Sequence, residues 1–303
     1  MIRSLKVTIL SDNRPGDSSL GTEHGFSLWI EADGHRIVFD TGQSALFVRN
    51  AEKCGIHTAG ADILVLSHGH YDHTGGVVDL LTPGSPMKIY CHPGVFVPRY
   101  SHHADGSVRQ IGISKVAAGA LYRCIDEINW TSQPVVLPEG IGITGPIPRI
   151  ADFEDTGGDF YLDRELHRRD PVEDDMALWF ETVKGIIVVT GCCHSGLVNT
   201  LTYVEKLTGG GRVYAVAGGL HLLNASEERM KKTCSYLADK GVSRLIPCHC
   251  TGEKAVVRLK KICGLSVEEG YAGAEFDLVR LNGERVGMEV PDDFGKRGVE
   301  FRR

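Results

Sequence analysis

Short apolar runs bounded by Gly, Asp or Ser alternate with amphipathic segments along the chain and predict strands that lie between helices. The clearest runs are Leu5–Leu10, Ile37–Phe39, Ile63–Leu66, Ile186–Val189 and Val213–Val216. Ser226 is a suitable cap for a helix that extends to Lys240 and stops at Gly241. Thr251 is a suitable cap for another helix, which ends at Gly264. Strands that alternate with helices predict a layered α/β domain.

Two segments with the pattern of a hairpin resemble each other. Residues 26–42 read FSLWIEADGHRIVFDTG and residues 176–191 read MALWFETVKGIIVVTG, so that Leu-Trp, Glu and the final Thr-Gly coincide with one gap. Two ordinary hairpins explain this similarity. A duplicated fold, whose pseudo-symmetric halves each bring a loop to a shared edge, explains it equally well. The sequence leaves both explanations open.

The stretch between these segments has a different composition. Residues 92–172 are rich in Gly, Pro, His and Arg and show weak periodicity. Long irregular stretches of this kind are often lids or binding loops. No low-complexity tract or linker divides the chain. We therefore predict one domain over residues 1–303, with residues 92–172 as a lid-like insertion within it.

Charge and composition exclude several classes of partner. The chain has 33 Lys and Arg against 39 Asp and Glu, and its formal charge of -6 repels phosphate backbones, so no nucleic-acid partner is expected. No apolar run approaches the ~18 residues of a membrane helix, so no membrane partner is expected. The first ten residues include Lys6 and predict a strand rather than a signal peptide. Nine Cys without a CxxC spacing indicate a reduced, cytoplasmic protein.

The segment SHGHYDHTGG, residues 67–76, carries the strongest chemical signal. A predicted strand leads directly into His68, His70, Asp72 and His73. Side chains at i and i+2 of an extended backbone point to the same side, and imidazole and carboxylate are the ligands of divalent metals such as zinc. Four such ligands exceed the needs of one centre when other His are available. Two adjacent metal ions therefore explain the segment better than a His-rich polar loop does.

Three further His follow predicted strands that end in small residues. They lie in TGCCHSG (residues 190–196), GGLH (residues 218–221) and IPCHCTG (residues 246–252). Sites in α/β folds form where strands end. We expect His194 and His249 to be metal ligands and His221 to be either a ligand or a proton donor. Four other His have no such setting and are expected on the surface: His24, His35, His57 and His167.

SHGHYDHTGG is similar to the His-x-His-x-Asp-His signature of the metallo-β-lactamase superfamily. Asp40, in FDTG, resembles the first motif of that superfamily, an Asp that usually lies behind a ligand, and His249, in PCH, resembles its last motif. These motifs, with TGCCHSG and GGLH, span residues 39–252. They are most similar to the branch labelled dihydropteroate-synthase-related, or ribofuranosylaminobenzene-phosphate-synthase-like. The resemblance implies an αββα sandwich of two similar halves.

The chain departs from the superfamily pattern at two places. A typical member has a His before the strand that matches Ala177–Thr182, where this chain has Asp174 and Asp175. A typical member also has an Asp that bridges the metals after the strand and its Thr-Gly, where this chain has Cys192 and Cys193. The pattern therefore leaves two ligands unassigned: the third ligand of the first metal ion and the ligand that bridges the two ions.

The expected centre holds two divalent ions, zinc first, with manganese or iron as alternatives. We assign His68, His70 and His194 to one ion and Asp72, His73 and His249 to the other. Whether His221, Cys192, Cys193 or Asp175 also binds metal is left open, since most thiols of a reduced protein are inert and buried. Asp40 is expected to hold a ligand His in the right tautomer from behind.

These residues predict a metal-dependent hydrolase that directs a metal-bound hydroxide at a small, anionic ester, lactone or phosphodiester. Asp72 would orient the hydroxide, and His221 would protonate the leaving group. We expect side chains of the insertion to bind the anionic group of the substrate. For each candidate the alternative is a position on a solvated loop face without a role in binding. The candidates are Arg99, His102, His103, Arg109 and Arg149.

Other functions remain as alternatives. A diiron redox enzyme of the superfamily is disfavoured because Gly69 stands where such members have a carboxylate. A nucleic-acid-processing member is disfavoured by the charge of -6. A non-catalytic metal-binding or sensor protein, and a pterin-pathway synthase-like activity as the branch label suggests, stay open. The expected partner is a small-molecule substrate, and the oligomeric state is not predicted.

Overall fold

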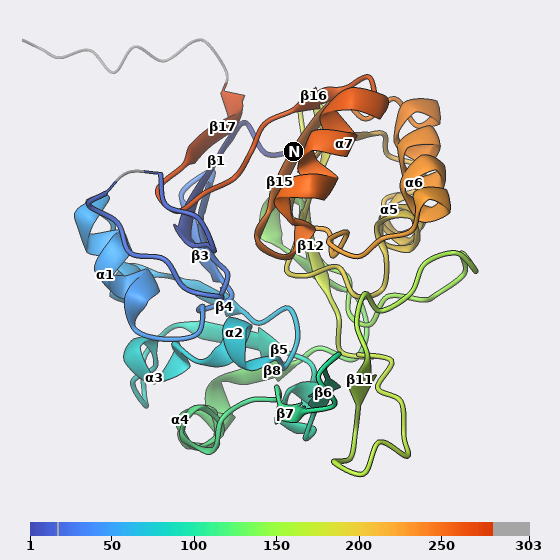
Figure 1. Ribbon diagram of the computed structural model, residues 1–303. Helices are drawn as coiled ribbons and strands as arrows, with labels where there is room; N and C mark the ends of the chain where they lie inside the picture. The colour runs from blue at the N-terminus through green and yellow to red at the C-terminus, as the bar shows by residue number, and fades with distance from the viewer. Residues whose placement is uncertain (17, 281–303) are drawn as a thin grey trace, which may run out of the picture.

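The computed structural model describes residues 1–16 and 18–280, which form two seven-stranded sheets stacked face to face (Figure 1). The first sheet has the order β17-β1-β2-β3-β4-β5-β8 and the second the order β16-β15-β14-β13-β12-β10-β9. The strands of the first sheet are β1 (Ser4–Ser11), β2 (Ser27–Ala32), β3 (His35–Phe39), β4 (Ile63–Val65), β5 (Lys88–Cys91), β8 (Ile128–Trp130) and β17 (Glu275–Arg280). Those of the second are β9 (Val135–Leu137), β10 (Ile141–Ile143), β12 (Ala177–Thr182), β13 (Gly185–Thr190), β14 (Val213–Gly219), β15 (Arg244–Cys248) and β16 (Ser266–Val267).

The two sheets repeat one pattern of strand pairing. In the first, the pairs from β17 to β3 are antiparallel and those from β3 to β8 are parallel. In the second, the pairs from β9 to β13 are antiparallel and those from β13 to β16 are parallel. The hairpins β2–β3 and β12–β13, which the sequence similarity singled out, occupy equivalent places. The sandwich of two similar halves is therefore confirmed.

Alternating side chains explain how the layers pack. In β2, Leu28 and Ile30 belong to the core between the sheets, whereas Trp29 packs on the opposite face. That outer face of the first sheet is covered by α1 (Leu46–Lys53), α3 (Val77–Leu80) and α4 (Lys115–Arg123). The outer face of the second sheet is covered by α5 (Leu197–Leu207), α6 (Glu227–Asp239) and α7 (Glu253–Ile262) (Figure 1). The layers are helix, sheet, sheet and helix, as predicted.

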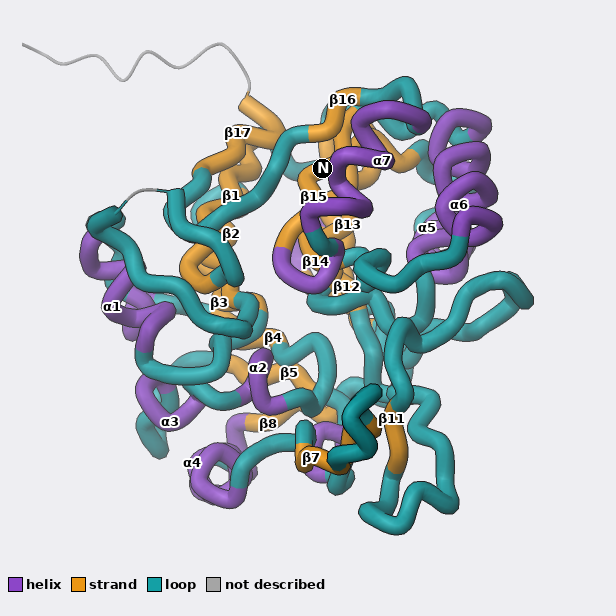
Figure 2. The backbone as a smooth tube through the Cα atoms, viewed as in Figure 1, coloured by secondary structure: helices purple, strands orange, loops and turns teal. Residues whose placement is uncertain are grey.

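A third sheet of three short strands lies outside the sandwich. It has the order β11-β6-β7, with β6 at Tyr100–His102, β7 at Val108–Gln110 and β11 at Phe160–Tyr161. Figure 2 shows β7 and β11 among long loops, apart from the strands of the large sheets. The boundaries predicted for the insertion differ from this arrangement, because α4, β8, β9 and β10 of residues 92–172 belong to the sandwich itself. Strands of three residues are too short to show periodicity.

Of the two predicted helix caps, one is confirmed and one is wrong. The Ser226 side chain accepts a hydrogen bond from the Arg229 N–H at 3.1 Å and caps α6. Gly252, rather than Thr251, is the cap residue of α7. The Thr251 hydroxyl instead donates to the Cys248 carbonyl and accepts from the Leu220 N–H, so it joins two strand ends.

A disulfide joins Cys234 of α6 to Cys263 at the end of α7. The prediction of a fully reduced chain is wrong for this pair, and cysteine usage no longer supports a cytoplasmic location. Within the described part of the chain, no helix combines the length and the apolar character that crossing a membrane requires.

Candidate metal centre

The SHGHYDHTGG segment runs from the end of β4 into α2 (Tyr71–Thr74). His68, His70, Asp72 and His73 are all buried there, none exposing more than 6 % of its surface. His68 Nε2 lies 2.9 Å from His70 Nδ1, so two imidazoles converge on one point. Burial, with further lowering by neighbouring basic groups, holds the pKa of both well below the ordinary value. Both rings are therefore neutral, which is the form that binds metal.

Three loops of the second half complete the site. Cys192 and His194 follow β13, His221 follows β14 and His249 follows β15. Because these strands are parallel neighbours, their carboxyl ends open onto the same edge. The structure thus brings together every residue that the sequence proposed as a metal ligand.

Backbone strain is concentrated at these strand ends. Asp40, Cys193, His221 and His249 have φ values of 58°, 60°, 43° and 47°, in the left-handed region that non-glycine residues rarely adopt. Each such residue costs on the order of 1–3 kcal/mol and persists only where the surroundings enforce it. Strain of this kind clusters at functional sites, which favours a functional role for this edge.

Three rings form what we call the histidine cluster: His68, His70 and His194. Their centroids are 4.6 to 4.8 Å apart. His194 Nδ1 donates to the Thr156 carbonyl at 2.8 Å, which leaves a lone pair on Nε2. The Nε2 atoms of His70 and His194 are buried and have no hydrogen-bond partner among the described residues. Unpartnered buried nitrogens are costly unless a ligand satisfies them, so the donor set fits a metal ion.

A second set, the mixed cluster, consists of Asp72, His73 and His249. Asp72 Oδ2 lies 3.3 Å from His249 Nε2 and 3.7 Å from His73 Nε2. His249 Nδ1 donates to Asn13 Oδ1 at 2.8 Å, so Nε2 faces the cluster as the acceptor atom. Despite burial, the adjacent imidazoles hold the pKa of Asp72 well below its ordinary value. The carboxylates of Asp40 and Asp72 overcome burial and raise the pKa of His73 to about 9. The cluster therefore favours positive charge, as a metal site does.

Asp40 supports the mixed cluster from behind. Its Oδ2 accepts from His73 Nδ1 at 2.6 Å and from the Ser67 hydroxyl at 2.6 Å, and its Oδ1 accepts from the Ser67 N–H at 2.7 Å. This contact fixes the orientation of the His73 ring, so that in the neutral, metal-binding form the lone pair of Nε2 faces the centre.

Replacing Asp40 by Asn should weaken metal binding about 10–100-fold, because the amide is a poorer acceptor for the His73 N–H. Equilibrium titration with a metal chelator measures the change. Asp33→Asn is the control, since the Asp33 carboxylate accepts backbone N–H groups of Arg3 and Ser4 outside the site. Equal metal affinity in the Asp40 and Asp33 variants would show that Asp40 does not support a ligand.

Asp174 and Asp175 lie just before β12 and hold two loops of the site in place. Asp174 Oδ2 accepts from the Gly69 N–H at 2.8 Å, between the two rings of the first motif. Asp175 Oδ2 accepts from the Ser195 N–H at 2.7 Å, next to His194. Burial raises the pKa of Asp175 to about 6. The two carboxylates hold the two loops in register, so His194 is left to complete the histidine cluster.

The predicted anion contacts are dispersed. Arg99 is buried and donates to Asp170 and Asp174, and Arg149 donates to the His194 carbonyl at 2.7 Å. The charge of Arg99 is therefore neutralised by carboxylates, whereas Arg149 is exposed and bonded to carbonyl groups, so it remains a predicted anion contact. His102 pairs with Asp159 at 2.9 Å, and His103 lies in the turn between β6 and β7. Arg109 is exposed on β7, and its charge acts on Tyr71, the neighbour of Asp72.

Sequence reasoning missed two residues at the rim. His24 was expected on the surface, and its side chain is indeed 56 % exposed. What the sequence did not predict is that its Nε2 lies 3.3 Å from Asp72 Oδ2. No signal pointed to it, because it lies in an irregular loop. Phe160 of β11 places its ring 5.2 Å from that of His70 and 5.4 Å from that of His194. It therefore forms a wall over the histidine cluster.

The chain at Gly157 and Phe160 also contacts His221. The rings of His221 and His194 are 4.5 Å apart, and a side chain at Gly157 would collide with the His221 ring. A residue larger than glycine at position 157 would displace His221 from the centre. The chain around β11 therefore helps to define the site.

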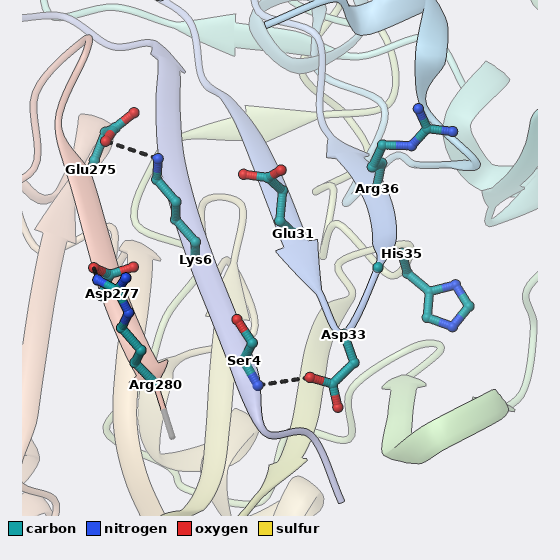
Figure 3. A pocket seen from close by; sticks show the side chains of 10 residues that line it. Ser4, Lys6, Glu31, Asp33, His35, Arg36, Glu275, Asp277 and Arg280 are labelled. Atoms are coloured by element: carbon teal, nitrogen blue, oxygen red, sulfur yellow. Dashed lines mark hydrogen bonds and ion pairs between the residues drawn. The ribbon is translucent and has the colours of Figure 1, made fainter. Parts of the chain in front are cut away.

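A different pocket, of about 610 Å³, lies on the outer face of the first sheet (Figure 3). It is lined by charged side chains of β1, β2, β3 and β17, which pair with one another, as Lys6 does with Glu275 at 2.9 Å. The neighbours of Lys6, Leu5 and Val7, point into the core, so this pocket lies on the far side of the sheet from the sandwich interior. It contains none of the metal-site residues.

Fold and site together define the class. The sequence profile of the metallo-beta-lactamase superfamily matches residues 20–249, and the chain belongs to that superfamily. A 7,8-dihydropterin-6-methyl-4-(beta-D-ribofuranosyl)-aminobenzene-5'-phosphate synthase of Methanocaldococcus jannaschii is 32% identical over 84% of this chain and 90% of its own length. An uncharacterized protein of the same organism is 32% identical over 84% of this chain and 94% of its own.

Solved structures agree with this assignment. Tm1679, described as a metal-dependent hydrolase of the beta-lactamase superfamily, superimposes with a TM-score of 0.76 at 28% identity, covering 91% of this chain and 99% of its own. A diphosphatase from the PhnP family superimposes with a TM-score of 0.52 at 14% identity, covering 93% of this chain and 100% of its own, and shares the fold alone. The superfamily assignment and the αββα fold are thus established by sequence and by structure.

Proposed function

We propose that the protein is a hydrolase that uses two divalent ions, zinc by preference, to cleave a small anionic ester, lactone or phosphodiester. The observation that carries the proposal is the meeting of the histidine cluster and the mixed cluster at one edge of the sandwich. The rings of His68 and His73, one from each cluster, are 4.2 Å apart. Two ions bound there would lower the pKa of water toward neutrality and stabilise negative charge on a carbonyl or phosphoryl oxygen.

The side chains of this chain would divide the remaining work. Asp72 offers a carboxylate in the mixed cluster, 3.3 Å from His249 Nε2, where it would orient the attacking water. His221 lies against His194 and is placed to give a proton to the leaving group from its imidazole. Phe160 covers the histidine cluster and excludes bulk water from it. Arg109 and His24 lie at the open rim, where an anionic group of the substrate would enter.

A second candidate is a transfer reaction at the same centre. It is favoured by the name of the 32% identical relative, which is called a synthase. In that case a substrate group other than water would accept the transferred fragment. Adding pterin and phosphorylated aromatic amine substrates to the assay distinguishes the two, because a hydrolase releases products without an acceptor.

The test combines metal analysis with a panel of esters, lactones and phosphodiesters. Elemental analysis after reconstitution should give about two zinc-class ions per chain, and chelation should abolish turnover. A reconstituted protein with metal content near zero contradicts the proposal. A fully loaded protein that hydrolyses no member of the panel favours the transfer reaction or a sensor.

The hairpin β6–β7 should govern substrate choice rather than metal binding. Shortening Ser101–Arg109 to a tight turn removes Arg109 from the rim but leaves both clusters in place. We expect the KM for anionic substrates to rise about fivefold, since one exposed charge contributes on the order of 1 kcal/mol, with metal content unchanged. Arg109→Ala should reproduce most of the increase. Equal losses of substrate affinity and metal would show instead that the hairpin is structural.

A further inference from the structure

Cys192 occupies the point between the histidine cluster and the mixed cluster. Its Sγ lies within 4.8 Å of ligand atoms of His68 and His194, and equally within 4.8 Å of ligand atoms of His73 and His249. The side chain is buried, with 3 % of its surface exposed. No other side chain belongs to a candidate group on both sides, among the residues that the structure describes.

The contact between the Cys192 thiol and His73 also supports a position at the metal centre. Sγ lies 3.1 Å from His73 Nε2, the ring nitrogen that the Asp40 contact on Nδ1 turns toward the centre. In the metal-free protein the imidazole and the thiol form a weak hydrogen bond. A cation between the two atoms would replace the protons that they carry, which pass to solvent, and would bind both sulfur and nitrogen.

We propose that the Cys192 thiolate is a shared ligand that bridges the two metal ions, in the place where typical superfamily members have an Asp. This inference rests on the metal centre of the proposed function, but not on turnover. A thiolate is a soft ligand, and sulfur at the bridge shifts the preference of the centre toward zinc, cobalt, iron or cadmium and away from manganese and magnesium. A carboxylate at the same position would instead suit harder ions such as magnesium and manganese.

The neighbouring cysteines provide matched comparisons. The Sγ of Cys193 points the other way, 3.4 Å from the Thr200 hydroxyl, and its side chain packs in the core beneath α5. Cys250 Sγ contacts the Cys192 carbonyl at 3.6 Å, and with Cys192 and His221 it forms a third candidate group, which includes no residue of the histidine cluster or the mixed cluster. Cys192 is therefore the cysteine that the geometry places between the two clusters, and Cys250 is the nearest rival sulfur.

Cobalt(II) replaced into the purified full-length protein tests the proposal, because sulfur bound to cobalt gives a near-ultraviolet charge-transfer absorption that nitrogen and oxygen ligands do not. The wild type should show this absorption, and its intensity should increase through two equivalents of cobalt. Cys192→Ser should lose it completely, while Cys193→Ser and Cys250→Ser should keep it. Cys192→Asp, which restores the usual bridge, should bind two cobalt ions without the absorption, even if the Ser variant fails to fold.

Each result has one meaning. Absorption lost in the Cys250 variant and kept in the Cys192 variant would overturn the assignment, as would two cobalt ions bound by the wild type with no absorption at all. Saturation after one equivalent would overturn the bridging position. If the protein shows the predicted absorption but hydrolyses no substrate, the thiolate ligand is supported and the hydrolase proposal is rejected. If the protein binds no cobalt, the thiolate ligand and the hydrolase proposal are both rejected.

Discussion

Asp72→Asn is expected to abolish turnover, with a loss of about 10³-fold or more, while the fold remains intact. Asn keeps the shape of the side chain but removes the negative charge that lies 3.3 Å from His249 and 3.7 Å from His73. In the wild type these imidazoles hold the pKa of Asp72 well below its ordinary value, so the charge is present throughout the neutral range. Without it, the mixed cluster loses its only carboxylate.

Activity, metal content and circular dichroism should be measured on the same preparation. Asp79→Asn provides the control, since Asp79 is an exposed carboxylate in the short helix that follows the motif. We expect the Asp79 variant to behave as the wild type. An Asp72→Asn protein that retains full metal content and activity would remove Asp72 from the proposed mechanism.

His194→Ala and His221→Ala are expected to fail in different ways. His194 belongs to the histidine cluster, and its Nε2 has no hydrogen-bond partner in the part of the chain that the structure describes. Its removal should lower the metal content by close to one ion, because the loss of a ligand weakens binding far more than the ~10–100-fold of a supporting contact. The His221→Ala variant should instead keep most of its metal, and its rate should fall by ~10²–10⁴-fold, which is the range of general acid catalysis.

The distinction is measured by elemental analysis together with a series of substrates that differ in leaving group. The rate loss of His221→Ala should be largest for poor leaving groups, which need a proton most. If His221→Ala loses an ion and His194→Ala does not, the two roles are exchanged and the first metal position lies at His221.

The sequence predicted the site correctly where a candidate ligand directly follows a strand. His68, His194 and His249 were predicted to meet because each follows an apolar run, and parallel strands of one layer end at one edge. The repeated hairpin carried enough similarity to suggest two halves, and the strand pairing shows the same order in both sheets. Patterns no longer than one hairpin were sufficient for these features.

Features that depend on distant contacts were not predictable. Arg99 has the composition of an anion site, but its neutralisation by Asp170 and Asp174 requires residues more than seventy positions away. His24 reaches Asp72 through an irregular loop without periodicity. The disulfide between Cys234 and Cys263 forms because α6 and α7 pack against each other. The spacing of the cysteines in the sequence does not predict that packing.

The distribution of the site along the chain has a consequence for folding. The cluster residues extend from His68 in the first half to His249 in the second, so they share one edge only after both sheets have formed and stacked. Contacts between distant segments form late, because the entropy of closing long loops must be overcome first. The nascent first half can offer only part of the donor set and would bind metal weakly. Tight metal uptake is therefore a late event that reports completed assembly, and a loaded ion then opposes separation of the two halves.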